Sequence, residues 1–356
     1  MRLTKKGLWR GVIREYADYL PKIQDSAITT LLEGNTPLIE SVNMKDIFAG
    51  ARLLFKFEGL NPTGSFKDRG MTVAVSKARE DGSEAVICAS TGNTSAAAAA
   101  YAARAGMRAY VLVPEGSIAL GKLSQAIMHG AMVMQIKGSF DDALKIVKEI
   151  TKGHPVTLVN SINPYRLEGQ KTAAFEVCEH LGHAPTYHFL PVGNAGNITA
   201  YWRGYNEYKE KGMISSLPKM MGFQAEGAAP IVLGHPVEHP NTIATAIKIG
   251  NPASWEGALK ARQESGGFIG SVTDAEIIEA YKLLASREGV FCEPASAAGL
   301  AGAIKMKKEE SLHDGDTVVC TITGHGLKDP DRAMQSSPKP VKTAADIKKI
   351  LKLMGF

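Results

Sequence analysis

Short runs of β-branched residues alternate with helical patterns along most of this chain. The clearest unit is residues 85–113, where an apparent buried strand at 85–88 precedes an alanine-rich helix at 94–105 and a second strand at 109–113. Strands joined by helical crossovers form parallel sheets. The pattern continues to residue 159 and resumes from 187 to 321. The sequence therefore predicts an α/β protein with two lobes.

Composition agrees with this prediction. A chain of 356 residues is long enough to bury two cores, and 44% hydrophobic against 22% charged residues suits packed α/β lobes. The four cysteines are widely spaced and form no CxxC pair. Such spacing favours a reducing cytoplasm over a disulfide framework.

The charge pattern narrows the class of partner. The net charge of +5 is modest, and basic residues are scattered except in the segment 339–352. This distribution disfavours a nucleic-acid partner and is compatible with an anionic substrate. Residues 1–19 lack the apolar core of a secretion signal, and no run of about eighteen apolar residues could span a bilayer. We therefore expect a cytoplasmic protein without a membrane partner.

A lysine stands at the start of an expected helix. The segment 61–70 reads Asn-Pro-Thr-Gly-Ser-Phe-Lys-Asp-Arg-Gly and follows an expected strand at 53–58. A helix amino terminus disfavours an ammonium ion, so it should lower the pKa of Lys67 and favour an amine that can form a Schiff base. Most lysines are solvated surface residues, so the neighbouring motifs must decide.

Two polar turns follow other expected strands, where open parallel sheets bind their ligands. The turn at 89–95 offers hydroxyls, an amide and backbone donors to a carboxylate or phosphate, although an ordinary helix cap explains it equally well. The turn at 193–197 reads Gly-Asn-Ala-Gly-Asn and would let the backbone approach a phosphate. It lacks the Gly-Lys-Ser/Thr of a P-loop, which disfavours a nucleoside triphosphate.

Together these segments resemble the β-family of pyridoxal-phosphate (PLP) enzymes, of fold type II, and within it the shorter microbial threonine synthases. The resemblance covers nearly the whole chain. It implies two open twisted-sheet lobes with the cofactor in the cleft between them. It rests on ordered matches at residues 34–38, 61–70, 160–171, 193–197, 242–252, 293–297 and 323–328.

The resemblance implies a set of cofactor contacts. Lys67 would carry PLP covalently, Asn93 would contact the ring hydroxyl, and Thr323 would face the pyridine nitrogen. A threonine there stabilises a pyridinium less than a carboxylate does, so the cofactor would be a milder electron sink. Without the adjoining Gly-His-Gly, Thr323 would be interpreted as a turn cap. The cofactor phosphate would be bound by the backbone of Gly193, Asn194, Ala195, Gly196 and Asn197.

The resemblance also implies a substrate site. Ser90, Thr91 and Thr94, with Asn93, would bind the amino-acid carboxylate. Asn160, Ser161 and Arg166 are similar to the family's site for the substrate phosphate. The planar fork of an arginine suits two phosphate oxygens, although a lone arginine at a helix start is more often a surface residue.

The implied reaction is that of a carbon–oxygen lyase in threonine biosynthesis. O-phospho-L-homoserine and water would give L-threonine and phosphate. Lys67 would remove an α-proton and then a β-proton, phosphate would leave the γ-carbon, and water would add at the β-carbon. The resemblance implies no metal in this path, and it implies a homodimer.

Two other functions stay open. A threonine or serine dehydratase of the same fold would keep Lys67 and the 193–197 turn, but it would not need the phosphate site around Arg166. A non-catalytic PLP-binding or amino-acid-binding protein of this fold is the second alternative, and the presence of Lys67 counts against it.

A zinc site is a weaker interpretation. The string His235-Pro-Val-Glu-His239 matches an inverted zincin motif, but Pro236 and Pro240 disfavour the helix that would bring both histidines to one face.

The lobes should divide at two places. We expect a smaller α/β lobe at 59–160. The larger, PLP-binding lobe would combine 1–58 with 161–356, including an amino-terminal helical segment and a final helix at 343–353.

Overall fold

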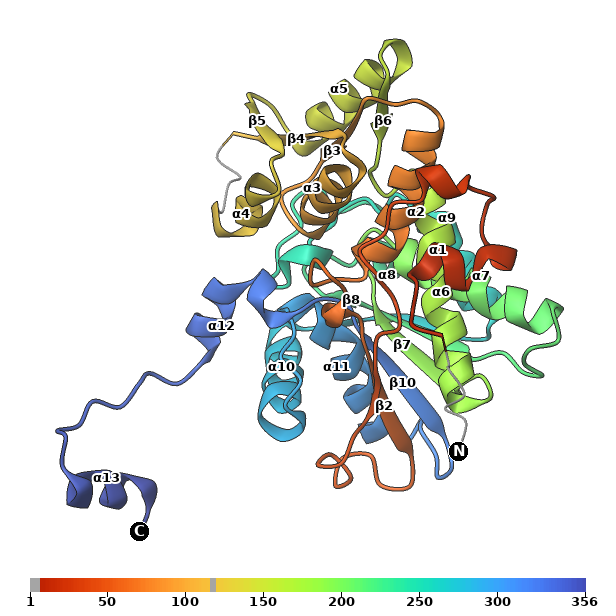
Figure 1. The fold of residues 1–356 in the computed structure, drawn as a ribbon. Helices are drawn as coiled ribbons and strands as arrows, with labels where there is room; N and C mark the ends of the chain where they lie inside the picture. The colour runs from red at the N-terminus through yellow and green to blue at the C-terminus, as the bar shows by residue number, and fades with distance from the viewer. Residues whose placement is uncertain (1–6, 116–119) are drawn as a thin grey trace, which may run out of the picture.

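The strands of the computed structural model form two sheets (Figure 1). The structure describes residues 7–115 and 120–356, so small parts of both expected lobes, 1–6 and 116–119, lie outside the described residues. One sheet has the order β1-β2-β10-β7-β8-β9 and the other β5-β4-β3-β6. Neighbouring strands are parallel except β1 with β2. The prediction of an α/β fold with two open sheets is confirmed.

The strands are β1 (Leu38–Glu40), β2 (Arg52–Phe57), β3 (Ala85–Ala89), β4 (Arg108–Pro114), β5 (Met132–Ile136), β6 (Val156–Leu158), β7 (Tyr187–Pro191), β8 (Lys219–Ala225), β9 (Phe268–Val272) and β10 (Thr317–Ile322). The α-helices are α1 (Val12–Glu15), α2 (Lys67–Glu80), α3 (Asn93–Ala105), α4 (Leu120–Met128), α5 (Phe140–Gly153), α6 (Pro164–Leu181), α7 (Gly196–Glu210), α8 (Pro230–Leu233), α9 (Trp255–Glu264), α10 (Asp274–Glu288), α11 (Pro294–Lys308), α12 (Pro330–Ser336) and α13 (Ile347–Met354). Short 3-10 helices include η3 (Glu58–Leu60), η4 (Thr245–Ile247) and η5 (Gly326–Lys328).

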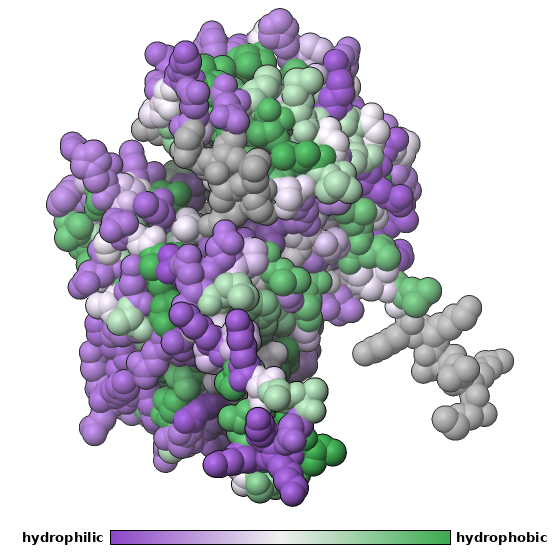
Figure 2. All heavy atoms as spheres, turned by 90° about the vertical axis from the view of Figure 1, so that its left-hand side faces the viewer, coloured by the Kyte–Doolittle hydropathy of each residue, from purple (hydrophilic) through white to green (hydrophobic). Residues whose placement is uncertain are grey.

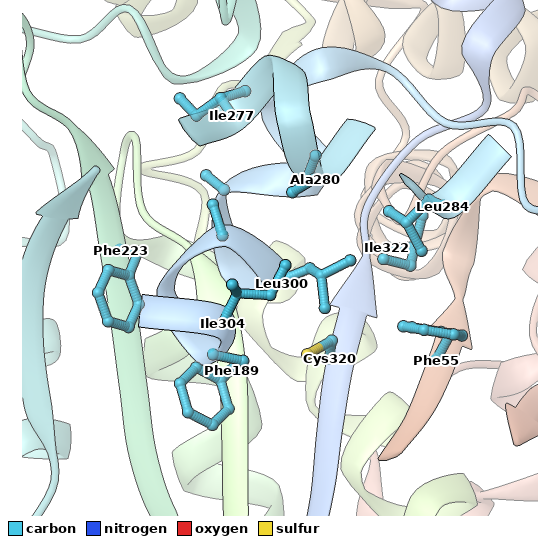
Figure 3. Close-up of a cluster of buried hydrophobic side chains, with 14 of the residues drawn as sticks. Phe55, Phe189, Phe223, Ile277, Ala280, Leu284, Leu300, Ile304, Cys320 and Ile322 are labelled. Atoms are coloured by element: carbon cyan, nitrogen blue, oxygen red, sulfur yellow. The ribbon is translucent and has the colours of Figure 1, made fainter. Parts of the chain in front are cut away.

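Each sheet has hydrophobic cores on both faces. The large sheet packs against α10 and α11 through Phe189, Phe223 and Leu300, among others (Figure 3). Its other face packs against α6 and α7, with Phe175 and Tyr205 in that core. The small sheet lies between a core shared with α2, α3 and α4 and another shared with α5.

The helices α2 and α6 cross closely. A Cβ on Gly169 of α6 would lie 1.8 Å from the carbonyl oxygen of Arg69 on α2. A Cβ on Gly70 would lie 2.6 Å from the carbonyl oxygen of Arg166 on α6. Only glycine permits this approach. It places α2, which begins with Lys67, directly against α6, which carries Arg166.

The last helix stands away from the body. The expected helix at 343–353 begins later, at Ile347, because the Asp346 side chain accepts from the Lys349 amide as its N-cap. A Pro-containing segment connects α12 to α13, and α13 lies apart from both sheets (Figure 1). Figure 2 looks from the side on which α13 lies, and shows hydrophobic and hydrophilic side chains together on the projecting segment at the bottom.

Two further findings concern sequence motifs. Residues 235–240 form an irregular loop, as the prolines predict. Within residues 7–115 and 120–356, no helix is both long and apolar enough to cross a membrane.

Candidate active site

Lys67 is the first residue of α2, as the sequence predicted. The loop before it is bonded to the end of β10: the amide of Phe66 donates to the carbonyl oxygen of Thr323 at 3.0 Å, and Ser65 forms an isolated bridge with Gly324. The Nζ of Lys67 lies 4.2 Å from the centroid of the Phe66 ring. The amine and Thr323 are therefore brought to the same end of the large sheet.

The Lys67 amine is easily deprotonated. Burial, and to a smaller extent the Arg166 guanidinium, lower its pKa to about 7, and the Glu293 carboxyl acts in the opposite direction. The sequence attributed the low pKa to the helix terminus, and the structure corrects this: burial and then Arg166 are the causes. An amine with this pKa is largely neutral near pH 7.5, as a nucleophile or a base must be.

Asn93 and Thr323 meet residues from the start of α11. The Asn93 Nδ2 donates to both oxygens of Glu293, at 3.0 and 3.1 Å. The Thr323 hydroxyl lies 2.8 Å from the Ser296 hydroxyl, and the Gly324 amide donates to Ser296 Oγ at 2.9 Å. Asn93 starts α3, which follows a strand of the small sheet, and Glu293 precedes α11, which packs on the large sheet, so this contact joins segments of the two sheets.

The turn at 193–197 forms a cradle at the amino terminus of α7. Ala195 has a φ of 62°, in the left-handed region, so successive backbone amides turn toward one side. A Cβ on Gly193 would lie 2.9 Å from the Cα of Ile247. A residue outside the turn holds the Asn194 side chain, because its oxygen accepts a hydrogen bond from the Ala253 amide. Both polar side-chain atoms of buried Asn197 have no partner.

Arg166 is a buried cation. Its side chain is 1% exposed, against the usual expectation for a single arginine at a helix start. One nitrogen donates to the carbonyl oxygen of Val159 at 2.7 Å, while Nε has no partner. Within the described part of the chain, no carboxylate lies within ion-pair distance of it. Burial lowers its pKa to about 10, so it remains a cation.

The other expected phosphate contacts lie beside Arg166 in the chain. The Asn160 amide exchanges two 2.9 Å bonds with the backbone of Ala89, so it fixes the end of β3. Ser161 is half-buried in the next position. In this conformation, Asn160 thus supports the turn after β3, and a direct phosphate contact stays a prediction.

The turn after β3 leads into α3. Ser90, Thr91 and Thr94 are half-buried, and Ser90 Oγ accepts from the Gly92 amide at 3.2 Å. The hydroxyls and free amides of a helix start suit a carboxylate.

The chain matches the family of pyridoxal-phosphate dependent enzymes over residues 29–324. It belongs to that family. It is 59% identical over 351 residues to a threonine synthase of Synechocystis, covering 98% of this chain and 91% of that protein. It is 57% identical over 347 residues to a threonine synthase of Mycobacterium tuberculosis, covering 96% of each. Among solved structures it resembles cysteine synthase from Entamoeba histolytica, with a TM-score of 0.75 at 19% identity over 96% of this chain and 95% of that one, a likeness of fold alone.

The residues present fit PLP, the cofactor of the family. The unpartnered Asn197 amide, the left-handed Ala195 and the crowded Gly193 form a phosphate cradle. Lys67 supplies an amine whose pKa is lowered to about 7. Asn93 and Thr323 offer polar atoms for the ring.

Sequence reasoning missed two residues of the site. Glu293 is 5% exposed and Ser296 is fully buried, and both bond to residues it had selected. The segment 293–297 contributed to the family resemblance. Nothing in the sequence placed Glu293 beside Asn93, because the contact joins residues 200 positions apart.

Proposed function

We propose that this protein is a threonine synthase, which converts O-phospho-L-homoserine and water into L-threonine and phosphate. The observation that carries the proposal is Arg166, a buried guanidinium without a carboxylate partner, close enough to Lys67 to lower the pKa of its amine. An unpaired buried charge is costly, so it is best explained by an anion that binds there. The relatives named threonine synthase support the same reaction.

Each residue of the site has a defined task. When bound, PLP withdraws electrons from the α-carbon of the amino acid, which makes its proton easier to remove. Lys67 anchors the cofactor and then accepts and returns protons through Nζ. Arg166, with Ser161 and Asn160, holds the substrate phosphate until it leaves the γ-carbon.

The remaining residues orient the reactants. The turn of Ser90, Thr91 and Thr94 binds the substrate carboxylate. Asn93 and Thr323 fix the cofactor ring, and the Gly193, Asn194, Ala195, Gly196 and Asn197 backbone holds its phosphate. Thr323 bonds to Ser296, a neutral partner, so the ring nitrogen faces hydroxyls and not a carboxylate.

The test measures two products. Purified holoenzyme should release phosphate from O-phospho-L-homoserine and form threonine in equal amounts. It should release ammonia from threonine far more slowly. Faster ammonia release from threonine or serine would instead establish the dehydratase alternative.

The lobe boundaries and the surroundings of the enzyme complete the proposal. We propose lobes at 59–160 and at 1–58 with 161–356; the small sheet, whose strands lie between Ala85 and Leu158, supports this division. We propose a cytoplasmic homodimer without a nucleic-acid or membrane partner. Four buried free cysteines agree with a reducing compartment.

The final helix supports the dimer. In α13, Ile347, Ile350, Leu351 and Met354 follow the i, i+3, i+4, i+7 spacing of one apolar face, and all are exposed. A helix of eight residues is not stable alone in water. Pro338 and Pro340 keep its tether extended, so we propose that α13 docks on a second copy.

The hollow between α10 and α11 offers a matching surface. It has a volume of about 190 Å³ and a floor of Ala280, Ala301 and Ile304. Around this floor lie Lys305 and Lys308 and the carboxylates of Glu276, Glu279 and Glu309. These carboxylates would face the lysines of α13. Light scattering should give a dimer for the full chain and a weaker one for a chain ending at Ser336. A monomeric full chain, or one that binds anionic vesicles, would contradict this arrangement.

A further inference from the structure

Glu293 is a buried acid that touches the cofactor side of the site. It is the N-cap residue of α11, yet its side chain makes no capping bond. Its backbone amide donates to the carbonyl oxygen of Gly324 at 3.0 Å. A Cβ on Gly324 would lie 2.5 Å from one carboxyl oxygen. The carboxyl is therefore held against the end of β10 and turned away from its own helix.

Among the residues that the structure describes, Asn93 is the only side chain that bonds to this carboxyl. No lysine or arginine of the described residues lies within ion-pair distance of it. A buried acid without a cation costs stability. Such a group is often kept because a site needs it.

The geometry of the contact leaves one N–H of Asn93 unused. Its Nδ2 lies nearly equally far from both Glu293 oxygens, at 3.0 and 3.1 Å. The two oxygens of one carboxyl subtend a much smaller angle than the ~120° between the two N–H bonds of an amide. One N–H is thus shared between the oxygens, and the other points elsewhere.

We propose that Glu293 is a positioning residue that holds one N–H of Asn93 and thereby aims the other at the cofactor ring. Asn93 alone could rotate about its side-chain torsions, and the bond to Glu293 fixes the plane of its amide. The inference rests on the proposed cofactor contact of Asn93 and not on the choice of substrate.

The groups that face Glu293 agree with this role. Burial raises the pKa of its carboxyl. The hydrogen bond from Asn93 and the charges of Lys328 and Lys67 lower this pKa, and the charge of Asp329 raises it. Asn93, Lys67 and Lys328 come from three different elements, α3, α2 and η5, and Asp329 directly follows η5. In return, Glu293 raises the pKa of Lys67, so the acid also belongs to the electrostatic surroundings of the catalytic amine.

A double-mutant cycle tests the proposal. The measured quantity is the Kd of PLP for the apoenzyme, together with the absorbance maximum of the bound cofactor. Glu293→Ala should weaken PLP binding about tenfold and shift the maximum, and Asn93→Ala should do the same. The double variant should be no more than about twofold weaker than Asn93→Ala alone, because Glu293 would act only through Asn93.

Two further variants separate the contact from the charge. Glu293→Gln keeps an oxygen that accepts from Asn93 and should bind PLP within about threefold of the native protein. Glu293→Asp keeps the charge but is too short to reach, and should resemble Glu293→Ala. Glu210→Ala, at the exposed carboxyl end of α7, is the matched control and should leave the Kd unchanged.

Several results would overturn the inference. Equal weakening by Glu293→Ala in the native and Asn93→Ala backgrounds would show an independent, structural role, and so would a large loss in Glu293→Gln. An unchanged Kd in Asn93→Ala would remove the cofactor contact and this inference with it. Phosphate release by the native enzyme would still stand in that case, so the two failures are distinguishable.

Discussion

Two groups of buried charges lie on opposite sides of α2, and they are built on opposite principles. In the first, Arg69 bonds to Glu58 and Glu176 at 2.6 Å each, and Lys56 bonds to Glu176 at 2.6 Å. Two cations meet two carboxylates. In the second, Lys67 and Arg166 share the cleft and neither has a carboxylate within ion-pair distance in the described chain.

The paired group holds the scaffold together. Glu176 also accepts from the amides of Asn35 and Thr36, and the Thr36 hydroxyl donates to Glu58. Burial alone would raise the pKa of Glu176, but Arg69 and Lys56 outweigh burial and hold that pKa at about 2. The Gly-Asn-Thr-Pro segment therefore takes part in this network. The comparison indicates that the buried cations with carboxylate partners stabilise the scaffold, and that the buried cations without such partners belong to the proposed ligand site.

The largest expected effect comes from the unpaired group. Lys67→Ala should lower turnover by on the order of 10³-fold or more, because it removes the amine that anchors the cofactor and moves the substrate protons. The unfolding free energy of the apoprotein should stay the same or rise, since a buried amine is removed. Borohydride reduction of the native holoenzyme followed by peptide mapping should place PLP on the Lys67 peptide. Label on another lysine would contradict the assignment.

A substitution in the paired group should instead lower the free energy of unfolding. Glu176→Gln leaves Arg69 and Lys56 buried with too little negative charge, so it should lower the unfolding free energy by about 3–5 kcal/mol. Urea unfolding followed by circular dichroism measures this loss. The control is Glu84→Gln, which breaks the exposed pair with Arg108 and should cost about 1 kcal/mol or less. Similar losses in both variants would refute the distinction between the two groups.

The sequence predicted the strongly patterned parts of this fold. The β3-α3-β4 unit and Lys67 at the start of α2 follow from hydrophobic periodicity and turn signals. It did not predict β9, because Gly270 interrupts the run of strand-forming residues there. It did not predict α11 either, because the Ala- and Gly-rich sequence of this helix is buried on most sides and has no amphipathic pattern. The three-residue β1 was also missed.

The site shows the same division. Local motifs selected Lys67, Asn93, Thr323 and the 193–197 turn. Local motifs could not show that Asn160 bonds to Ala89, that Arg166 lacks a carboxylate, or that Glu293 reaches Asn93, because these facts depend on how distant segments pack.

Arg166→Met should affect binding more than stability. Loss of a charge-assisted bond to phosphate should cost about 2 kcal/mol of substrate-binding free energy, which raises the KM for O-phospho-L-homoserine roughly 30-fold. The affinity for PLP should change little, and the unfolding free energy should hold or increase because an unpaired charge leaves the core. Steady-state kinetics measures the KM, and urea unfolding measures the free energy of unfolding. Arg203→Ala, on the exposed face of α7, is the control. Lost PLP binding with an unchanged KM would reassign Arg166 to the cofactor.

The smallest expected effect is on the Lys67 amine itself. Only the neutral amine can attack PLP, so the rate at which apoenzyme captures the cofactor should rise with pH and level off above about 7, the pKa of Lys67. Arg166→Met removes a positive charge that opposes protonation, so the midpoint should move to higher pH. Burial is the larger cause of the low pKa and is retained, so the move should be less than about one pH unit. Stopped-flow absorbance across a pH series gives both midpoints. A midpoint near that of a solvated lysine, about 10.4, would mean that Arg166 and not burial controls the amine, and an unchanged midpoint would mean that the two cations do not interact.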